Sequence, residues 1–148
     1  MCRLYRKFLV ILQYIYLQEL KNMLKTGKKH TSEVTVEERH LACNVGSGDL
    51  PVLATPMMMA LMENAAMLCV AGDLDAGQTT VGGFISSSHL KPTPLGATVT
   101  ATAELVSVQG RKLTFKVHAE DGSGVIGEGE HLRFIVDGNV FMSKLTSK

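Results

Sequence analysis

Residues 55–71 constrain the fold of this chain more than any other segment. Positions 57–70 read MMMALMENAAMLCV, in which Glu63 and Asn64 are the only polar side chains. Read as a helix, the segment is apolar around its whole circumference, and a helix of this kind is usually buried on all sides. The sequence therefore predicts a helix enclosed by the rest of the fold, with Glu63 withdrawn from water inside it.

Glu63 is the first candidate functional residue, because a carboxylate in such surroundings gives folding little advantage. Withdrawing a carboxylate from water costs several kcal/mol unless a partner compensates for the lost hydration. The structural explanation would be a Lys or Arg from elsewhere in the fold, but no cation lies at helical spacing from Glu63. We therefore favour a chemical role, either as a nucleophile or as the base that activates a water.

The predicted helix has recognisable ends, and the segments around it have the period of strands. Thr55 is expected to be the N-cap, Pro56 the first helical residue and Gly72 the stop signal. Alternation of polar and apolar residues predicts one short strand before the helix and four long strands after it, with turns rich in Gly and Pro between the long ones. These strands are expected at 31–36, 80–90, 97–109, 112–120 and 125–136, and 140–142 are expected to add a short last piece.

This order of elements is an α+β pattern, and the simplest packing curves an antiparallel sheet around the single helix. The 148 residues suffice for one domain. A net charge of +1, without a dense basic cluster, argues against a nucleic-acid binder. Three widely spaced cysteines suit a reducing compartment, so we expect a cytoplasmic protein. No spacing of His, Cys and carboxylate residues suits a metal site.

Residues 1–24 differ from the rest of the chain. Basic residues precede an apolar run at 8–17, which is too short to span a bilayer, since spanning takes roughly 20 residues. The run has the length of a signal-peptide core, but no small-residue cleavage site follows it. We therefore divide the chain into an N-terminal leader or extra helix at 1–24 and a domain at 25–148. Packing, secretion and membrane attachment remain open as roles of the leader.

Several motifs together resemble one family. The stretch LATPMMMALMENAA at 53–66, the pair Gly82-Gly83, His89 and the stretch EHLR at 130–133 resemble the fluoroacetyl-CoA thioesterase-like branch of the hotdog-fold thioesterases. The resemblance covers about residues 25–136. It implies the hotdog fold, in which a curved antiparallel sheet wraps one long hydrophobic helix. It also implies a homodimer or a dimer of dimers, with the sheets continuing from one protomer to the next.

The same resemblance implies a set of site residues. Thr55, Glu63 and His89 correspond to the catalytic Thr, Glu and His of the family, while Gly82 and Arg133 match a strand glycine and a late arginine. The implied activity is hydrolysis of acyl-CoA thioesters, with coenzyme A entering as part of the substrate and no cofactor required.

The residue types admit simpler interpretations beside the catalytic ones. Thr55 could serve only as a helix cap, and eight residues of ideal helix would place it about 12 Å from Glu63. Gly82 and Gly83 inside a strand indicate a bulge, and free N–H groups there, or at the helix start, could hold an oxyanion. His89 has a side chain suited to proton transfer near neutral pH, and His131 is the reserve candidate. Four cations could bind the substrate through the phosphates of coenzyme A, although most residues of this kind are merely solvated: Arg133, Lys91, Arg111 and Lys112.

One departure from the family pattern bears on the substrate. The fluoroacetyl-specific enzymes have a Phe-rich segment before the catalytic Thr, whereas residues 46–53 read GSGDLPVL here. We therefore expect small or short-chain acyl-CoA thioesters, without a commitment to fluoroacetyl-CoA. Two alternatives remain open: a non-catalytic acyl-CoA binding or sensing protein, and a dehydratase or hydratase of the same fold.

Overall fold

The computed structural model describes residues 2–21 and 24–147, with side-chain detail from residue 6 to 16 and from 24 to 147. The elements are, in order, α1 (Cys2–Lys21), β1 (Lys29–Thr35), η1 (Glu38–His40), α2 (Ala42–Val45), α3 (Thr55–Ala71), β2 (Gln78–His89), β3 (Thr98–Gln109), β4 (Lys112–Asp121), β5 (Gly124–Asp137) and α4 (Gly138–Thr146). The central helix and the five main strands that the sequence predicts are all present, with strand ends shifted by at most two residues. The short helices η1 and α2 lie in the segment that leads to α3.

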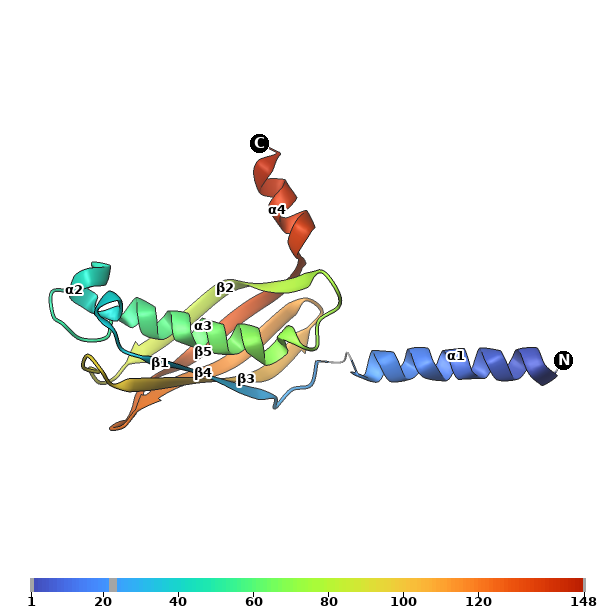
Figure 1. Cartoon of the computed structure of the whole chain (residues 1–148), viewed down its shortest axis with the longest axis horizontal. Coiled ribbons are helices and arrows are strands. Elements are labelled where there is room, and N and C mark those ends of the chain that lie inside the picture. Colours follow the sequence, from blue (N-terminus) through green and yellow to red (C-terminus); the bar gives the residue numbers. More distant parts are fainter. Residues whose placement is uncertain (1, 22–23, 148) are drawn as a thin grey trace.

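The five strands form one antiparallel sheet in the order β1-β3-β4-β5-β2, and the sheet curves around α3 (Figure 1). Every second residue of the central strands is buried, because these residues face the helix. They contribute Val99, Ala101, Ala103 and Leu105 from β3 and Leu113, Phe115, Val117 and Ala119 from β4 to the core. This arrangement confirms the α+β architecture of the hotdog fold.

Helix α3 is buried on one side only. Met58, Met62 and Ala66 have no exposed surface and pack against the sheet. Ala60, Asn64 and Leu68 lie on the opposite side and are exposed, Leu68 to the extent of 42%. The expectation of burial all round is therefore wrong for a single chain, because one curved sheet covers only half of a helix. The exposed side of α3 is free to meet another surface.

Strand β2 forms one edge of the sheet and contains the predicted bulge. It pairs with β5 alone among the described strands, and its register shifts between Gly82 and Phe84. An extra residue at a bulge bends the strand and increases its twist. The other side of β2 remains open for pairing with a strand from outside the described part of the chain.

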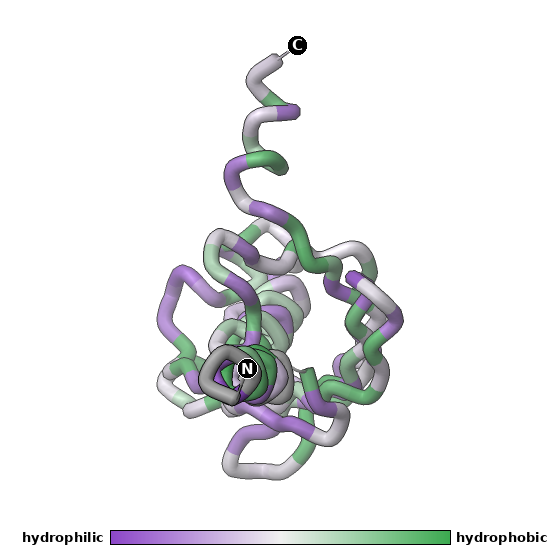
Figure 2. The backbone as a smooth tube through the Cα atoms, turned by 90° about the vertical axis from the view of Figure 1, so that its right-hand side faces the viewer, coloured by the Kyte–Doolittle hydropathy of each residue, from purple (hydrophilic) through white to green (hydrophobic). Residues whose placement is uncertain are grey.

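Both ends of the chain leave the domain. Helix α1 extends away from it in Figure 1, and its side chains are exposed at residues 6–16. None of the helices within the described residues is both long and apolar enough to cross a membrane. Helix α4 stands clear of the domain in both views (Figures 1 and 2). The expected strand at 140–142 is wrong, because the Asp137 carboxylate accepts a hydrogen bond from the Val140 N–H at 2.9 Å and caps a helix there.

Candidate active site

Thr55 and His89 meet where α3 begins and β2 ends. The N-cap of α3 is Ala54, so Thr55 is the first helical residue and the expected cap role of its side chain is wrong. Its hydroxyl Oγ1 lies 2.7 Å from Nδ1 of His89 instead. The threonine side chain therefore serves a histidine from another element, which a simple capping role would not require.

The surroundings of His89 favour its neutral form. Burial lowers the pKa of His89, and the backbone of Lys91 opposes this effect in part. The other ring nitrogen, Nε2, is buried and has no hydrogen-bond partner among the described residues. A neutral imidazole that carries its proton on Nε2 can accept a hydrogen bond from the Thr55 hydroxyl at Nδ1. His89 is thus placed to act as a base toward Thr55 and to hold the Thr55 hydroxyl in one orientation.

A cavity of about 250 Å³ lies beside this pair. Thr55 and His89 contribute to its wall, together with Ala42, Ser47, Val52, Leu53, Leu90, Lys91 and Pro92. Much of this lining comes from the segment between η1 and α3, where the side chains are small or aliphatic. Residues 46–53 contribute no aromatic side chain to this wall.

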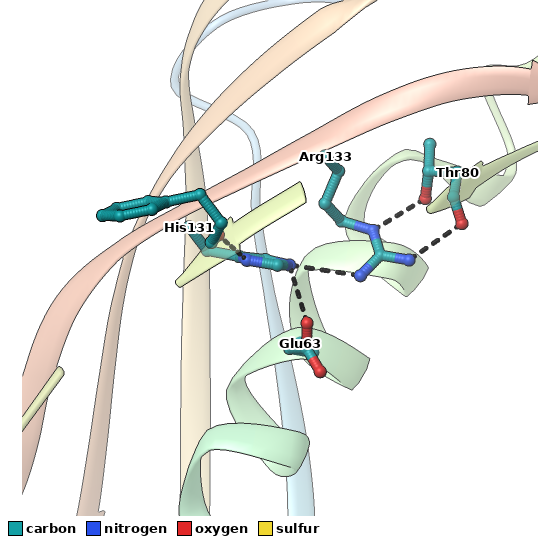
Figure 3. Close-up of polar contacts among 5 residues, drawn as sticks. Glu63, Thr80, His131 and Arg133 are labelled. Carbon is teal, nitrogen blue, oxygen red and sulfur yellow. Dashed lines mark hydrogen bonds and ion pairs between the residues drawn. The ribbon is translucent and has the colours of Figure 1, made fainter. Parts of the chain in front are cut away.

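Glu63 lies two turns further along α3 and is not fully buried, because 40% of its side chain is exposed. Its Oε1 points toward β5 and lies 3.6 Å from Nε2 of His131 (Figure 3). A Cβ atom added to Gly82 would stand only 2.7 Å from the same oxygen. Glycine at position 82 is thus what allows the carboxylate to approach the bulge of β2.

His131 and Arg133 form a buried network beneath Glu63. Nδ1 of His131 donates to the Phe84 carbonyl at 2.7 Å, which leaves Nε2 to accept from Nη1 of Arg133 at 3.1 Å. The other N–H groups of the Arg133 guanidinium donate to Thr80, from Nε to Oγ1 at 2.8 Å and from Nη2 to the backbone carbonyl at 2.9 Å. We call these residues, Thr80, His131 and Arg133, the arginine network.

The arginine network fixes the charges around Glu63. Burial lowers the pKa of His131, and the positive charge of Arg133 acts in the same direction, against the opposing effects of the Phe84 carbonyl and Glu63. His131 is therefore neutral near pH 7, and its contact with Glu63 is not an ion pair. Burial also lowers the pKa of Arg133, and Glu63 opposes that shift, but a guanidinium stays protonated. Arg133 is the cation that the sequence did not place beside Glu63.

One chain thus contains two clusters of predicted site residues. Thr55 meets His89, and Glu63 meets Gly82 and the arginine network, while α3 separates Thr55 from Glu63 by about 12 Å. Gly83 faces away from both clusters, since a Cβ there would meet the ring of Phe134. His131 was only the reserve candidate, yet its position two residues before Arg133 on a strand places both on the same face.

The described part of the chain has no cluster of metal-binding side chains, and its Arg133 is not accessible to a phosphate of the substrate. No group of three or more His, Cys, Asp or Glu side chains there could hold a metal ion. Arg133 is only 7% exposed and directs its N–H groups to Thr80 and His131. Lys91 and Arg111 are exposed cations, and Lys91 donates to the Ser123 carbonyl at 2.9 Å.

Known proteins with the same organisation identify the family. The family described as "Fluoroacetyl-CoA-specific thioesterase" matches residues 36–139. A fluoroacetyl-CoA thioesterase from Streptantibioticus cattleyicolor is 36% identical over 135 residues, which cover 87% of this chain and 97% of the relative. The chain belongs to the fluoroacetyl-CoA-specific thioesterase family. The family resemblance that the sequence motifs indicated is therefore confirmed.

Solved structures agree with this membership. A variant of the fluoroacetyl-CoA thioesterase in complex with acetyl-CoA superposes with a TM-score of 0.79 at 32% identity, covering 83% of this chain and 97% of that one. A thioesterase superfamily member from Thermus thermophilus superposes with a TM-score of 0.78 at 22% identity, covering 84% of this chain and 92% of its own. The second likeness concerns the fold alone, and it confirms the hotdog architecture.

Proposed function

We propose that this protein is a thioesterase that hydrolyses small or short-chain acyl-CoA thioesters, with Thr55, Glu63 and His89 as its catalytic residues. Membership of a thioesterase family supports the reaction class. The hydrogen bond between Thr55 and His89 carries the site assignment, because it joins two of the three residues from distant parts of the sequence. Glu63 is the third, beside the bulge of β2.

The two clusters combine if two protomers pair along β2. A homodimer with two-fold symmetry pairs identical edge strands antiparallel, so that each end of β2 meets the opposite end of its partner. An axis midway between Gly82 and His89, near Ile85 and Ser86, would set His89 of one protomer opposite Gly82 of the other. Thr55 and His89 would then face the Glu63 cluster of the partner across the interface. The open edge of β2 and the exposed side of α3 support this pairing.

Hydrolysis at such a site would divide among these residues. Glu63 attacks the thioester carbonyl itself or removes a proton from an attacking water, and the guanidinium of Arg133 supplies a positive charge nearby. Backbone N–H groups at the bulge of β2 or at the start of α3 stabilise the oxyanion that develops on the carbonyl. When the tetrahedral intermediate collapses, the C–S bond breaks and the thiolate leaves. In the water route, the proton that Glu63 removed from the water passes to the thiolate through Thr55 and His89. In the nucleophile route, a water then hydrolyses the mixed anhydride on Glu63, and a proton of that water neutralises the thiolate by the same path.

No cofactor is needed for this reaction, because water, a carboxylate and hydrogen-bond donors suffice. Lys91 and Arg111 are exposed cations that could contact the phosphates of coenzyme A. The free thiols of Cys43 and Cys69 are compatible with a reducing, cytoplasmic compartment.

Release of free thiol from a panel of acyl-CoA thioesters tests the proposal. Glu63→Gln and His89→Ala should each lower kcat/KM by at least about a hundredfold, the usual contribution of a base or proton donor. Glu130→Gln and His118→Ala are matched controls, because these side chains lie on the face of the sheet that points away from α3. Full activity in both Glu63→Gln and His89→Ala would refute the catalytic assignment.

The same panel distinguishes the alternative of a binding or sensing protein. Equilibrium binding of coenzyme A and acyl-CoA, measured beside turnover, would then show affinity without thiol release. Hydration of an enoyl-CoA would instead indicate a hydratase.

A further inference from the structure

Helix α4 ends the described chain with an apolar face that nothing covers. Val140, Phe141, Met142 and Leu145 are exposed by 52%, 39%, 56% and 61% respectively. Phe141, Met142 and Leu145 lie within about 100° of one another on the helix, because each residue turns by about 100°. No residue of α4 is buried. A nine-residue helix has only marginal stability in water by itself, so we expect its apolar face to pack against another surface.

The root of α4 is fixed to the edge of the sheet. Its first residue, Gly138, donates from its backbone N–H to the Gly77 carbonyl at 3.0 Å, immediately before β2. The Asp137 cap holds the first turn in place. From this root α4 leaves the domain on the side of β2 in Figure 1 and stands clear of the domain again in Figure 2. The helix therefore projects past the open edge of the sheet.

We propose that α4 of one protomer packs over the Thr55–His89 cavity of its partner and completes the wall of the acyl site. The proposal rests on the proposed homodimer. Antiparallel pairing of the two β2 strands brings the Gln78 end of one strand, where α4 is rooted, beside the His89 end of the other. The cavity of about 250 Å³ lies at that end.

The surface around that cavity complements the apolar face of α4. Val45, Leu50 and Leu90 belong to the segments that line the cavity, and they are exposed by 39%, 67% and 57%. Burial of such side chains against those of α4 removes apolar surface from water on both protomers. The cavity wall at 46–53 carries no aromatic side chain, and Phe141 of the partner subunit supplies one. Acyl size would thus be selected by a residue of the other subunit.

The test begins with a double substitution on the apolar face of α4, Phe141→Ser with Leu145→Ser. We expect the KM for the preferred acyl-CoA to rise at least about fivefold through the loss of two apolar contacts, with a smaller change in kcat. Asn139→Ser with Lys144→Ser is the matched control, since it places the same new side chains at polar positions of the same helix. Unchanged KM in the apolar-face variant would overturn the proposal.

A mixed dimer shows on which subunit α4 acts. One subunit carries the two apolar-face substitutions and an intact Thr55, and the other carries an intact α4 with Thr55→Ala. With two affinity tags the mixed dimer can be purified, and its only Thr55–His89 site lies on the subunit with the altered helix. A wild-type KM per active site is expected, because the intact α4 comes from the partner. If the mixed dimer instead shows the raised KM of the doubly substituted protein, α4 acts on its own chain, which overturns the proposal.

Amide hydrogen exchange tests the packing of α4 independently of enzyme activity. If the wild-type protein hydrolyses no acyl-CoA, the proposed function fails, but α4 is still tested by exchange in segment 42–53. The two apolar-face substitutions should speed exchange there, and the matched control should not. Equal exchange in all three proteins, or a monomer by sedimentation, would refute the packing of α4 on a partner.

Discussion

Arg133→Met is the substitution that tests the arginine network most directly. Arg133 donates three hydrogen bonds, to Oγ1 and the carbonyl of Thr80 and to Nε2 of His131. Methionine fills much of the same volume but leaves these buried acceptors without a donor. The three lost hydrogen bonds, at roughly 1.5 kcal/mol for each bond to a charged donor, lower the unfolding free energy. About 1–2 kcal/mol is regained because a buried methionine, unlike a buried guanidinium, gives up no hydration on folding. The net loss of unfolding free energy is therefore about 3 kcal/mol.

The pH dependence of that loss is the sharper part of the prediction. The pKa of His131 is lowered in the folded protein, so the unfolded chain takes up its proton first as the pH falls below about 6.5. Wild-type stability therefore decreases on acidification, by at most about 1.4 kcal/mol per pH unit from this group. Without Arg133, the pKa of His131 rises because a positive charge is removed and Glu63 remains 3.6 Å away. The variant should lose less stability on acidification.

Urea unfolding at pH 7.5 and 5.5 measures both effects. The stability difference between wild type and Arg133→Met should be near 3 kcal/mol at the higher pH and smaller at the lower one. Arg111→Met is the control, since it removes the same charge from an exposed position. A difference no larger than that of Arg111→Met, or one that grows on acidification, would refute the account of the network.

Three further predictions concern single groups. Thr55→Val, which keeps the shape but removes the hydroxyl, should lower kcat/KM by at least about tenfold in the thiol-release assay while the unfolding free energy changes by only about 1 kcal/mol. The pKa of His89 is lowered by burial, so kcat/KM should hold down to about pH 6.5 and fall below it, a decline that His89→Ala would not show. The pKa of Asp121 is lowered chiefly by a hydrogen bond from the Ser123 side chain, so the stability that this carboxylate contributes above about pH 4 is lost as the pH falls further. In Asp121→Asn, the melting temperature measured by thermal unfolding should therefore fall less steeply with acidification below about pH 4.

The sequence was sufficient for the architecture because its local signals agreed with one another. The apolar segment at 57–70 and the period-two strands predicted α3 and the sheet, and the Gly82-Gly83 pair predicted the bulge. The predictions that failed were at positions where two local signals compete. Residues 140–142 have strand-like side chains, yet the Asp137 cap begins a helix there, and Ala54 rather than Thr55 caps α3.

The candidate site could be predicted only in part, because its charges depend on contacts between distant strands. A search at helical spacing from Glu63 could not find Arg133, which approaches from β5, seventy residues later in the sequence. The exposed 40% of Glu63 likewise follows from the curvature of the sheet, which covers one side of α3 and leaves the other open. The catalytic trio itself stays a prediction until turnover of the variants is measured.

Position 82 has a consequence for how this family can diverge. The space that a side chain there would occupy is already filled by Oε1 of Glu63, 2.7 Å from where its Cβ would stand. A side chain at position 82 would therefore push the flexible end of Glu63 away from the bulge and from His131, so the two positions should vary together among relatives. A lineage that gives up the carboxylate is released from the glycine, whereas one that keeps the carboxylate at this place must keep the glycine. Coupled variation at this pair would record, in sequence alone, which branches have retained the same site.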